Sequence, residues 1–170
     1  PNTNGATNQF ALGVGTVGGR GSVGVVYRQM GFEYGLPHPA GDEGIRIDGV
    51  RRMAALQSTL STGFAPIATL RVDGTSQWYS HNEIEPDGAI GTEFKLNTQT
   101  VNVTGRTHVG RMTGAVGVQG LFREYRPVGL EAFVPGSTNN NVAAFVFQEL
   151  PLGVGAAEDH SPRLQVGARY

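Results

Sequence analysis

Apolar or small side chains alternate with polar ones from Thr69 to His81, at the start of the segment Thr69 to Phe94. One parity carries Leu70, Val72, Gly74, Ser76 and Trp78, and the other carries Arg71, Asp73, Thr75, Gln77, Tyr79 and His81. Because successive side chains of a β-strand point to opposite faces, this alternation predicts a strand with one apolar and one polar face. The run is about as long as a tilted membrane-crossing β-strand, which has about 9–11 residues. An acidic, turn-rich stretch follows at 83–88, and the chain becomes extended again at Thr92.

Seven further segments are expected to form strands. They are 9–17, 20–32, 45–61, 92–107, 116–123, 142–150 and 164–170. In 92–107, Phe94 and Leu96 lie on one parity while Val101 and Val103 lie on the other, which predicts a β-bulge between them. No segment shows sustained helical spacing. The predicted fold class is therefore all-β, an antiparallel meander of about eight long strands.

The connections between these segments alternate in length, short and then long, along most of the chain. Outer-membrane barrels combine short periplasmic turns with longer extracellular loops. The alternation therefore predicts that residues 1–170 are a segment of a larger transmembrane β-barrel. Val23, Val25, Tyr27, Leu70, Val72, Trp78 and Phe122 would face lipid. The competing interpretation makes them the core of a soluble barrel or sandwich, whose strands also alternate.

Composition and charge exclude several classes of protein. The sequence has no cysteine, so neither a disulfide framework nor thiolate chemistry is expected. A net charge of −1 implies no general attraction to nucleic acid. The sequence contains no run of about 18 apolar residues, so no membrane-spanning helix is predicted. The 26 glycines among 170 residues are well above the usual share of about 7%.

Catalytic residues are not expected. Asp159, His160 and Ser161 are the residue types of a hydrolase triad, but they are consecutive. Members of such a relay meet through the fold rather than along one loop. We therefore expect no enzymatic activity and no resident cofactor.

Four stretches carry a resemblance to a known family. They are YGLPHPAGDEGIRID at 34–48, YSHNEIEPDGAIGTEF at 79–94, GLEAFVP at 129–135 and LQVGARY at 164–170. In this order and spacing the chain resembles TonB-dependent outer-membrane receptors, and most closely the subgroup with zinc-uptake receptors. The resemblance implies a barrel of about 22 strands filled by an N-terminal plug. It also implies the bacterial outer membrane as location, membrane lipid as surroundings, and coupling to the TonB complex through a plug that this stretch lacks.

A metal-capture site is predicted from the loop 36–44 and the end of the strand before 83–88. The loop holds His38, Asp42 and Glu43, and His81 and Glu83 would complete the site. Imidazole and carboxylate groups are the ligands that suit zinc where thiolates are absent. The alternative is an exposed loop of ordinary polar residues.

These observations favour one function over another. The expected function is that of the barrel portion of a TonB-dependent transport receptor, which takes up a scarce metal ion, such as zinc, or a metal chelate. The alternative is a standalone eight-stranded barrel or a soluble β-sandwich that acts as a binding or structural module.

Overall fold

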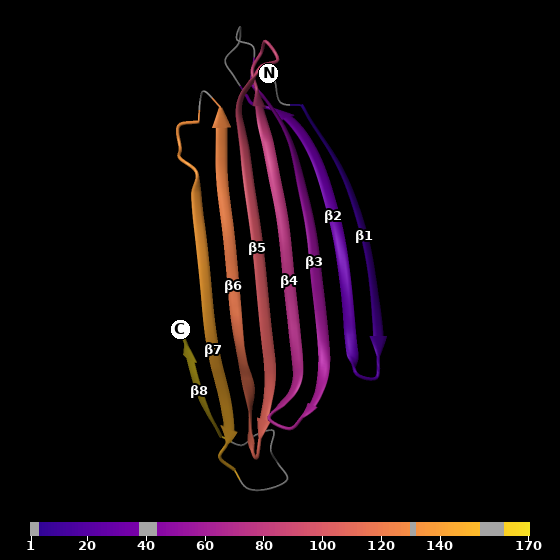
Figure 1. Cartoon of the computed structure of the whole chain (residues 1–170), viewed down its shortest axis with the longest axis vertical. Coiled ribbons are helices and arrows are strands. Elements are labelled where there is room, and N and C mark those ends of the chain that lie inside the picture. The colour runs from indigo at the N-terminus through magenta and orange to yellow at the C-terminus, as the bar shows by residue number, and fades with distance from the viewer. Residues whose placement is uncertain (1–3, 38–43, 130–131, 154–161) are drawn as a thin grey trace.

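The computed structural model describes residues 4–37, 44–129, 132–153 and 162–170. Within them every regular element is a strand: β1 (Gly5–Gly18), β2 (Gly21–Gly35), β3 (Arg46–Phe64), β4 (Ile67–Ile84), β5 (Ile90–Val109), β6 (Met112–Gly129), β7 (Ser137–Pro151) and β8 (Arg163–Arg169). Each strand pairs antiparallel with the next, so the eight strands form one sheet in sequence order (Figure 1). The all-β meander is confirmed. A helix of the length and apolar character needed to cross a membrane is not found among the described residues.

Three tight turns close one end of the sheet. The strand pairs β1–β2, β3–β4 and β5–β6 are joined there by Gly19-Arg20, Ala65-Pro66 and Gly110-Arg111. Gly110 has a φ of 60°, a left-handed conformation that favours glycine. The longer connections after β2, β4 and β6 leave from the other end, so the alternation of connection lengths follows the two ends of the sheet as far as β6 (Figure 1). We call these the turn end and the loop end. The connection between β7 and β8, residues 152–162, is also longer than a tight turn but starts from the turn end.

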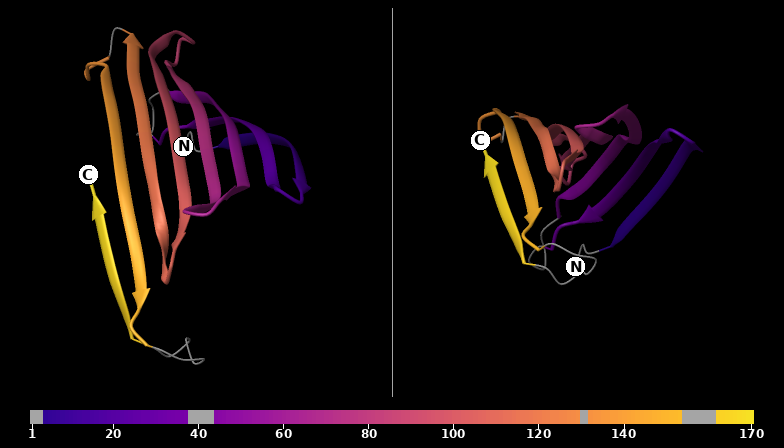
Figure 2. Two further views of the ribbon diagram at one scale, coloured as in Figure 1. Left: turned by 60° about the horizontal axis from the view of Figure 1, so that its bottom comes forward. Right: turned by 90° about the horizontal axis from the view of Figure 1, so that it is seen from below.

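The sheet is a single curved layer rather than two packed layers. Seen from below, the strands follow an arch from β1 to β8 (Figure 2). β1 and β8 lie at opposite edges and do not pair with each other. A sandwich of two stacked sheets and a closed eight-stranded barrel, the folds of the alternative interpretation, are therefore not formed by the described strands.

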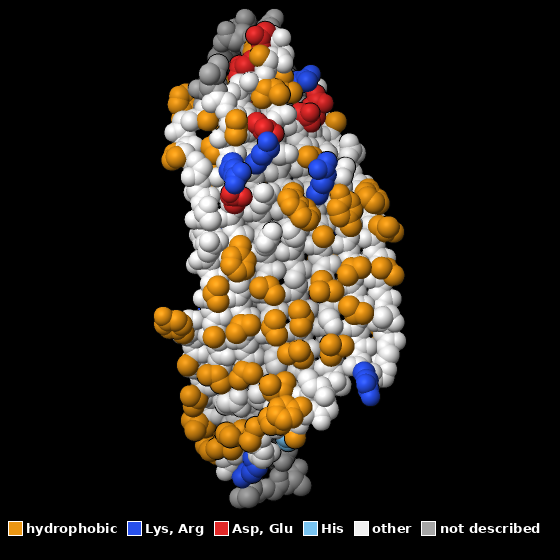
Figure 3. All heavy atoms as spheres, in the orientation of Figure 1, with side chains coloured by type: hydrophobic (Ala, Val, Ile, Leu, Met, Phe, Trp, Pro, Cys, Tyr) orange, Lys and Arg blue, Asp and Glu red, His pale blue; other side chains and the backbone are white. Residues whose placement is uncertain are grey.

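The register assigns every strand residue to one of two faces. Val25 pairs with Leu56, Leu56 with Gly74, Gly74 with Val101, and Val101 with Gly120. Since directly opposed residues share a face, these apolar or small residues gather on one face of the sheet, where Figure 3 shows many apolar side chains. The predicted apolar residues Val23, Val25, Tyr27, Leu70, Val72, Trp78 and Phe122 all belong to this face.

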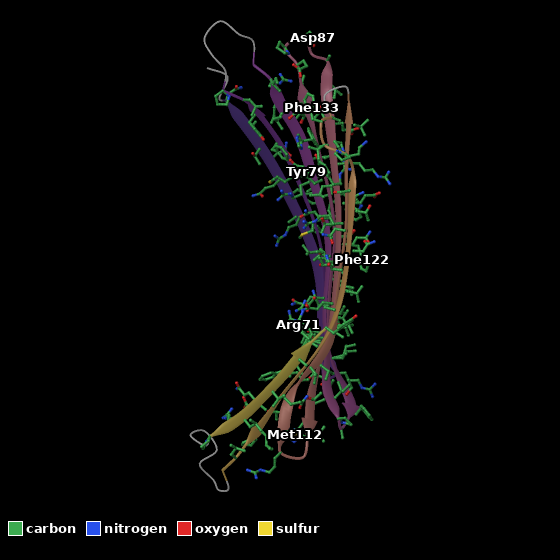
Figure 4. All side chains as sticks on the ribbon, turned by 90° about the vertical axis from the view of Figure 1, so that its left-hand side faces the viewer. Arg71, Tyr79, Asp87, Met112, Phe122 and Phe133 are labelled. Carbon is green, nitrogen blue, oxygen red and sulfur yellow. The ribbon has the colours of Figure 1, made fainter. Side chains whose placement is uncertain are left out.

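The two faces differ in curvature as well as in chemistry. Tyr79 and Arg71 point to the inner side of the curved sheet, and Phe122 lies on the outer side (Figure 4). We call the outer, apolar side the convex face and the inner, polar side the concave face. Of the buried side chains among the described residues, Ile47, Thr92 and Thr98 belong to the concave face and Ser58 to the convex face.

The bulge predicted inside β5 is wrong. From Phe94 to Val103 the strand keeps one register with both β4 and β6. In the described strands, irregular register occurs only near strand ends, between Ser61 and Phe64, Ile67 and Thr69, and Glu83 and Ile84. Phe94 and Leu96 instead lie on the concave face, so apolar residues change parity without any break in the strand.

Candidate functional site

The convex face carries an exposed apolar band across all eight strands. Its large side chains include Leu12, Val14, Val25, Leu56, Trp78, Val101, Val118, Phe122, Val142, Val146, Leu164 and Val166, each at least 39% exposed. Leu70 and Trp78, eight residues apart, bound the band on β4, which gives about 27 Å along the strand. A shallow groove of about 870 Å³ crosses it between Leu12, Leu56 and Phe122. Exposed apolar surface of this extent marks contact with lipid or with another protein.

Charged side chains replace the apolar ones on the convex face toward the loop end (Figure 3). Lys95 Nζ lies 2.7 Å from Glu93 Oε2, and Arg126 Nε donates to Glu124 Oε1 at 2.7 Å. Trp78 is opposite Arg52 in register and stands at the boundary. Exposed ion pairs contribute only about 0–1 kcal/mol, so the significance of this charged band is its position above the apolar one.

The concave face carries hydrogen-bonded polar side chains at the same height as the apolar band. Arg71 Nε donates to Asp73 Oδ2 at 2.7 Å, and Gln57 donates to Asp73 Oδ1 at 3.2 Å. The hydroxyls of Thr75 and Thr100 lie 2.6 Å apart. Arg71, Asp73, Gln77 and Tyr79, predicted to share the polar face, do share it.

An aromatic row crosses the concave face toward the loop end. We use this name for Tyr34, Phe32, Tyr79, His81, Phe94 and Tyr125, from β2, β4, β5 and β6, whose neighbouring ring centroids are 4.7–6.3 Å apart. Such distances are typical of interacting aromatic rings.

Gly49 makes this row continuous across β3. It stands between Phe32 of β2 and His81 of β4 in register. A Cβ atom at Gly49 would overlap the ring of Phe32 and would lie 2.9 Å from the Cβ of His81. The missing side chain is therefore what lets the Phe32 ring lie over β3 and reach Tyr79.

Of the predicted metal ligands, only His81 and Glu83 belong to the described residues. They are two positions apart on β4 and share the concave face. His81 is stacked on Phe94 at 4.7 Å, and its buried Nδ1 has no hydrogen-bond partner in the described part of the chain. His38, Asp42 and Glu43 lie outside the described residues, as do Asp159, His160 and Ser161. Among the described residues no three His, Asp or Glu side chains are grouped so that they could hold a metal ion.

The aromatic row is the feature that sequence reasoning missed. Its signal was present in β5, where Phe94 and Leu96 fall on the polar parity. Their partners across β4 and β6 become visible only with the register, because Tyr79, His81 and Tyr125 are far apart in the chain. The chain matches no protein-family model, and a search of curated proteins finds no significant relative.

Proposed function

We propose that the chain is part of the wall of a transmembrane β-barrel in the bacterial outer membrane, and that this barrel belongs to a TonB-dependent transport receptor. The observation that supports the membrane assignment most is the separation of the two faces of a single-layer sheet. On β4 the convex face carries apolar or small side chains over about 27 Å of strand, and the concave face of this strand is polar at the same height. Strands of outer-membrane barrels are tilted by about 35–45°, so this length corresponds to a height of about 19–22 Å, slightly less than the apolar band of about 25 Å in such barrels.

Three further features support the membrane assignment. Trp78 stands where the apolar band gives way to charged side chains, as aromatic residues do at membrane interfaces. As far as β6 the short turns lie at one end and the longer connections leave from the other, as in outer-membrane barrels, whereas the longer connection 152–162 between β7 and β8 starts from the turn end (Figure 1). β1 and β8 leave unpaired edges, which lipid does not satisfy, so additional strands would complete the wall.

The cargo that we propose is a scarce metal, taken up as an ion such as zinc or as a chelate. His81 and Glu83 lie on the concave face of β4 toward the loop end. His38, Asp42 and Glu43 belong to the segment between β2 and β3 and lie outside the described residues. These residues would act as a capture site above the lumen, because imidazole and carboxylate are zinc ligands.

Cell fractionation and uptake test this proposal. The full-length gene product is expected in the outer-membrane fraction and to need detergent for extraction. Cells that lack the gene are expected to take up less radioactive zinc at low external concentration, and a strain without TonB should show the same loss. A product found in the aqueous fraction would contradict the membrane assignment. Correct location with unchanged zinc uptake would contradict only the cargo.

A further inference from the structure

A second groove lies on the concave face, over β1 to β4, next to the aromatic row. It encloses about 600 Å³, which is the size of a site for a small organic molecule. Its concave-face side chains include Gln9, Arg28, Met30, Arg51, Met53 and Gln77. Arg28 is opposite Met53, and Arg51 is opposite Met30, so the two arginines are diagonal neighbours on β2 and β3.

Neither arginine has a carboxylate partner among the described residues. The ion pairs found there engage Arg46, Arg71, Lys95, Arg126 and Arg163 instead. The guanidinium carbon of Arg51 lies 5.5 Å from the centre of the Tyr79 ring, a contact that orients the group without neutralising it. Both arginines are exposed, so both are open to a ligand.

The surrounding face does not supply the missing negative charge. Arginines on the concave side of the strands outnumber acids by seven to three. The arginines are Arg28, Arg51, Arg71, Arg106, Arg123, Arg163 and Arg169, and the acids are Asp73, Glu83 and Glu149. Asp73 and Glu149 already pair with Arg71 and Arg163. The concave face therefore has an excess of positive charge, which raises the local concentration of anions.

We propose that this groove binds the oxyanion group, carboxylate or phosphate, of a small organic molecule. Arg28 and Arg51 would each donate a pair of hydrogen bonds, since the planar guanidinium matches carboxylate and phosphate geometry. The side-chain amides of Gln9 and Gln77 are further donors, and Met30 and Met53 cover an apolar part of the ligand. The same charges disfavour a bare divalent cation in this groove. This site goes beyond the proposed function, because it requires only that the concave face meets water.

Calorimetric titration of the purified full-length protein tests the site. The probes are citrate, inorganic phosphate and zinc chloride, added separately. Citrate or phosphate is expected to bind with a dissociation constant below about 1 mM, and which of the two binds more tightly distinguishes a carboxylate from a phosphate ligand. Arg28→Gln and Arg51→Gln should each weaken that binding about 10-fold or more, the loss expected for a charge-assisted hydrogen bond.

Arg123→Gln is the matched control, because it removes one unpaired positive charge from the same face but lies on β6, outside the groove. It should change the affinity less than about 2-fold, which is under 0.5 kcal/mol. The double variant Arg28→Lys plus Arg51→Lys keeps the charge and should still bind more weakly, since lysine lacks the planar fork. Failure of both anions to bind would overturn the site, and so would equal losses in the groove and control variants. Anion binding by a protein that imports no metal would leave the site standing and contradict only the proposed function.

Discussion

Substitutions of single residues on β4 test whether each face of the sheet contacts lipid or water. Val72 lies in the apolar band, between Ser58 and Val103 in register, and Thr75 lies on the concave face with its hydroxyl against Thr100. If the convex face contacts lipid, Val72→Arg should cost about 2–4 kcal/mol of unfolding free energy. Thr75→Arg should lose only about the 0.5–1.5 kcal/mol of one hydrogen bond. Denaturant titration of the full-length protein in lipid vesicles measures both. Equal, small effects would contradict a lipid-facing Val72.

Gly49 is a second residue whose role can be isolated. Gly49→Ala should displace the Phe32 ring from the aromatic row and cost about 1–3 kcal/mol, as overpacking does. The near-ultraviolet circular dichroism of the aromatic rings should change with it. Gly74→Ala on β4 is the control, since its Cβ would meet only the Thr100 carbonyl oxygen at 3.8 Å. It should be neutral or stabilise the protein by about 0.5–1 kcal/mol. A stable Gly49→Ala variant with an unchanged spectrum would mean that the ring does not depend on this glycine.

At the scale of elements, two tight turns of similar sequence have different requirements. Gly19-Arg20 joins β1 to β2, and Gly110-Arg111 joins β5 to β6. Only Gly110 of these two glycines has a left-handed φ, and an added Cβ would meet nothing within 4 Å at either. Gly110→Ala should therefore lose about 1–2 kcal/mol of unfolding free energy through backbone strain alone. Gly19→Ala should lose almost nothing. The reverse order of stabilities would show that the two turns differ in some other way.

The strands could be predicted from the sequence because the alternation of apolar and polar residues along one strand can be recognised without knowing its neighbouring strands. The face of β4 that holds Leu70, Val72 and Trp78 needed only the parity of the residues. Alternation misled in β5, where Phe94 belongs to the aromatic row on the concave face and Leu96 lies on the same face opposite Tyr79. In the sequence, this shift of apolar residues from one parity to the other looks like a bulge. The groove around Arg28 and Arg51 was beyond sequence reasoning, since their diagonal contact depends on the register between β2 and β3.

For the whole molecule, the open edges of β1 and β8 decide how the chain behaves alone. Each edge presents a row of unpaired backbone groups, which favours pairing with other chains. Residues 1–170 refolded in detergent should therefore form oligomers or aggregates rather than a single monomeric species. Size-exclusion chromatography distinguishes these outcomes, as does a detergent gel that compares unheated with heated samples. A heat-modifiable monomer would contradict the prediction and would favour closure of the eight strands into a small barrel.

The unbroken register within β2 to β6 also limits how this sequence can change over evolution. Register shifts occur near strand ends alone in the described sheet. A single residue inserted in the middle of β4 would turn every later side chain of that strand to the opposite face, which would place Trp78 inside and Tyr79 outside. Two inserted residues would restore the faces and lengthen the strand by about 7 Å. Homologous sequences should therefore differ in length by even numbers inside these strands, and by any number in the connections at the loop end.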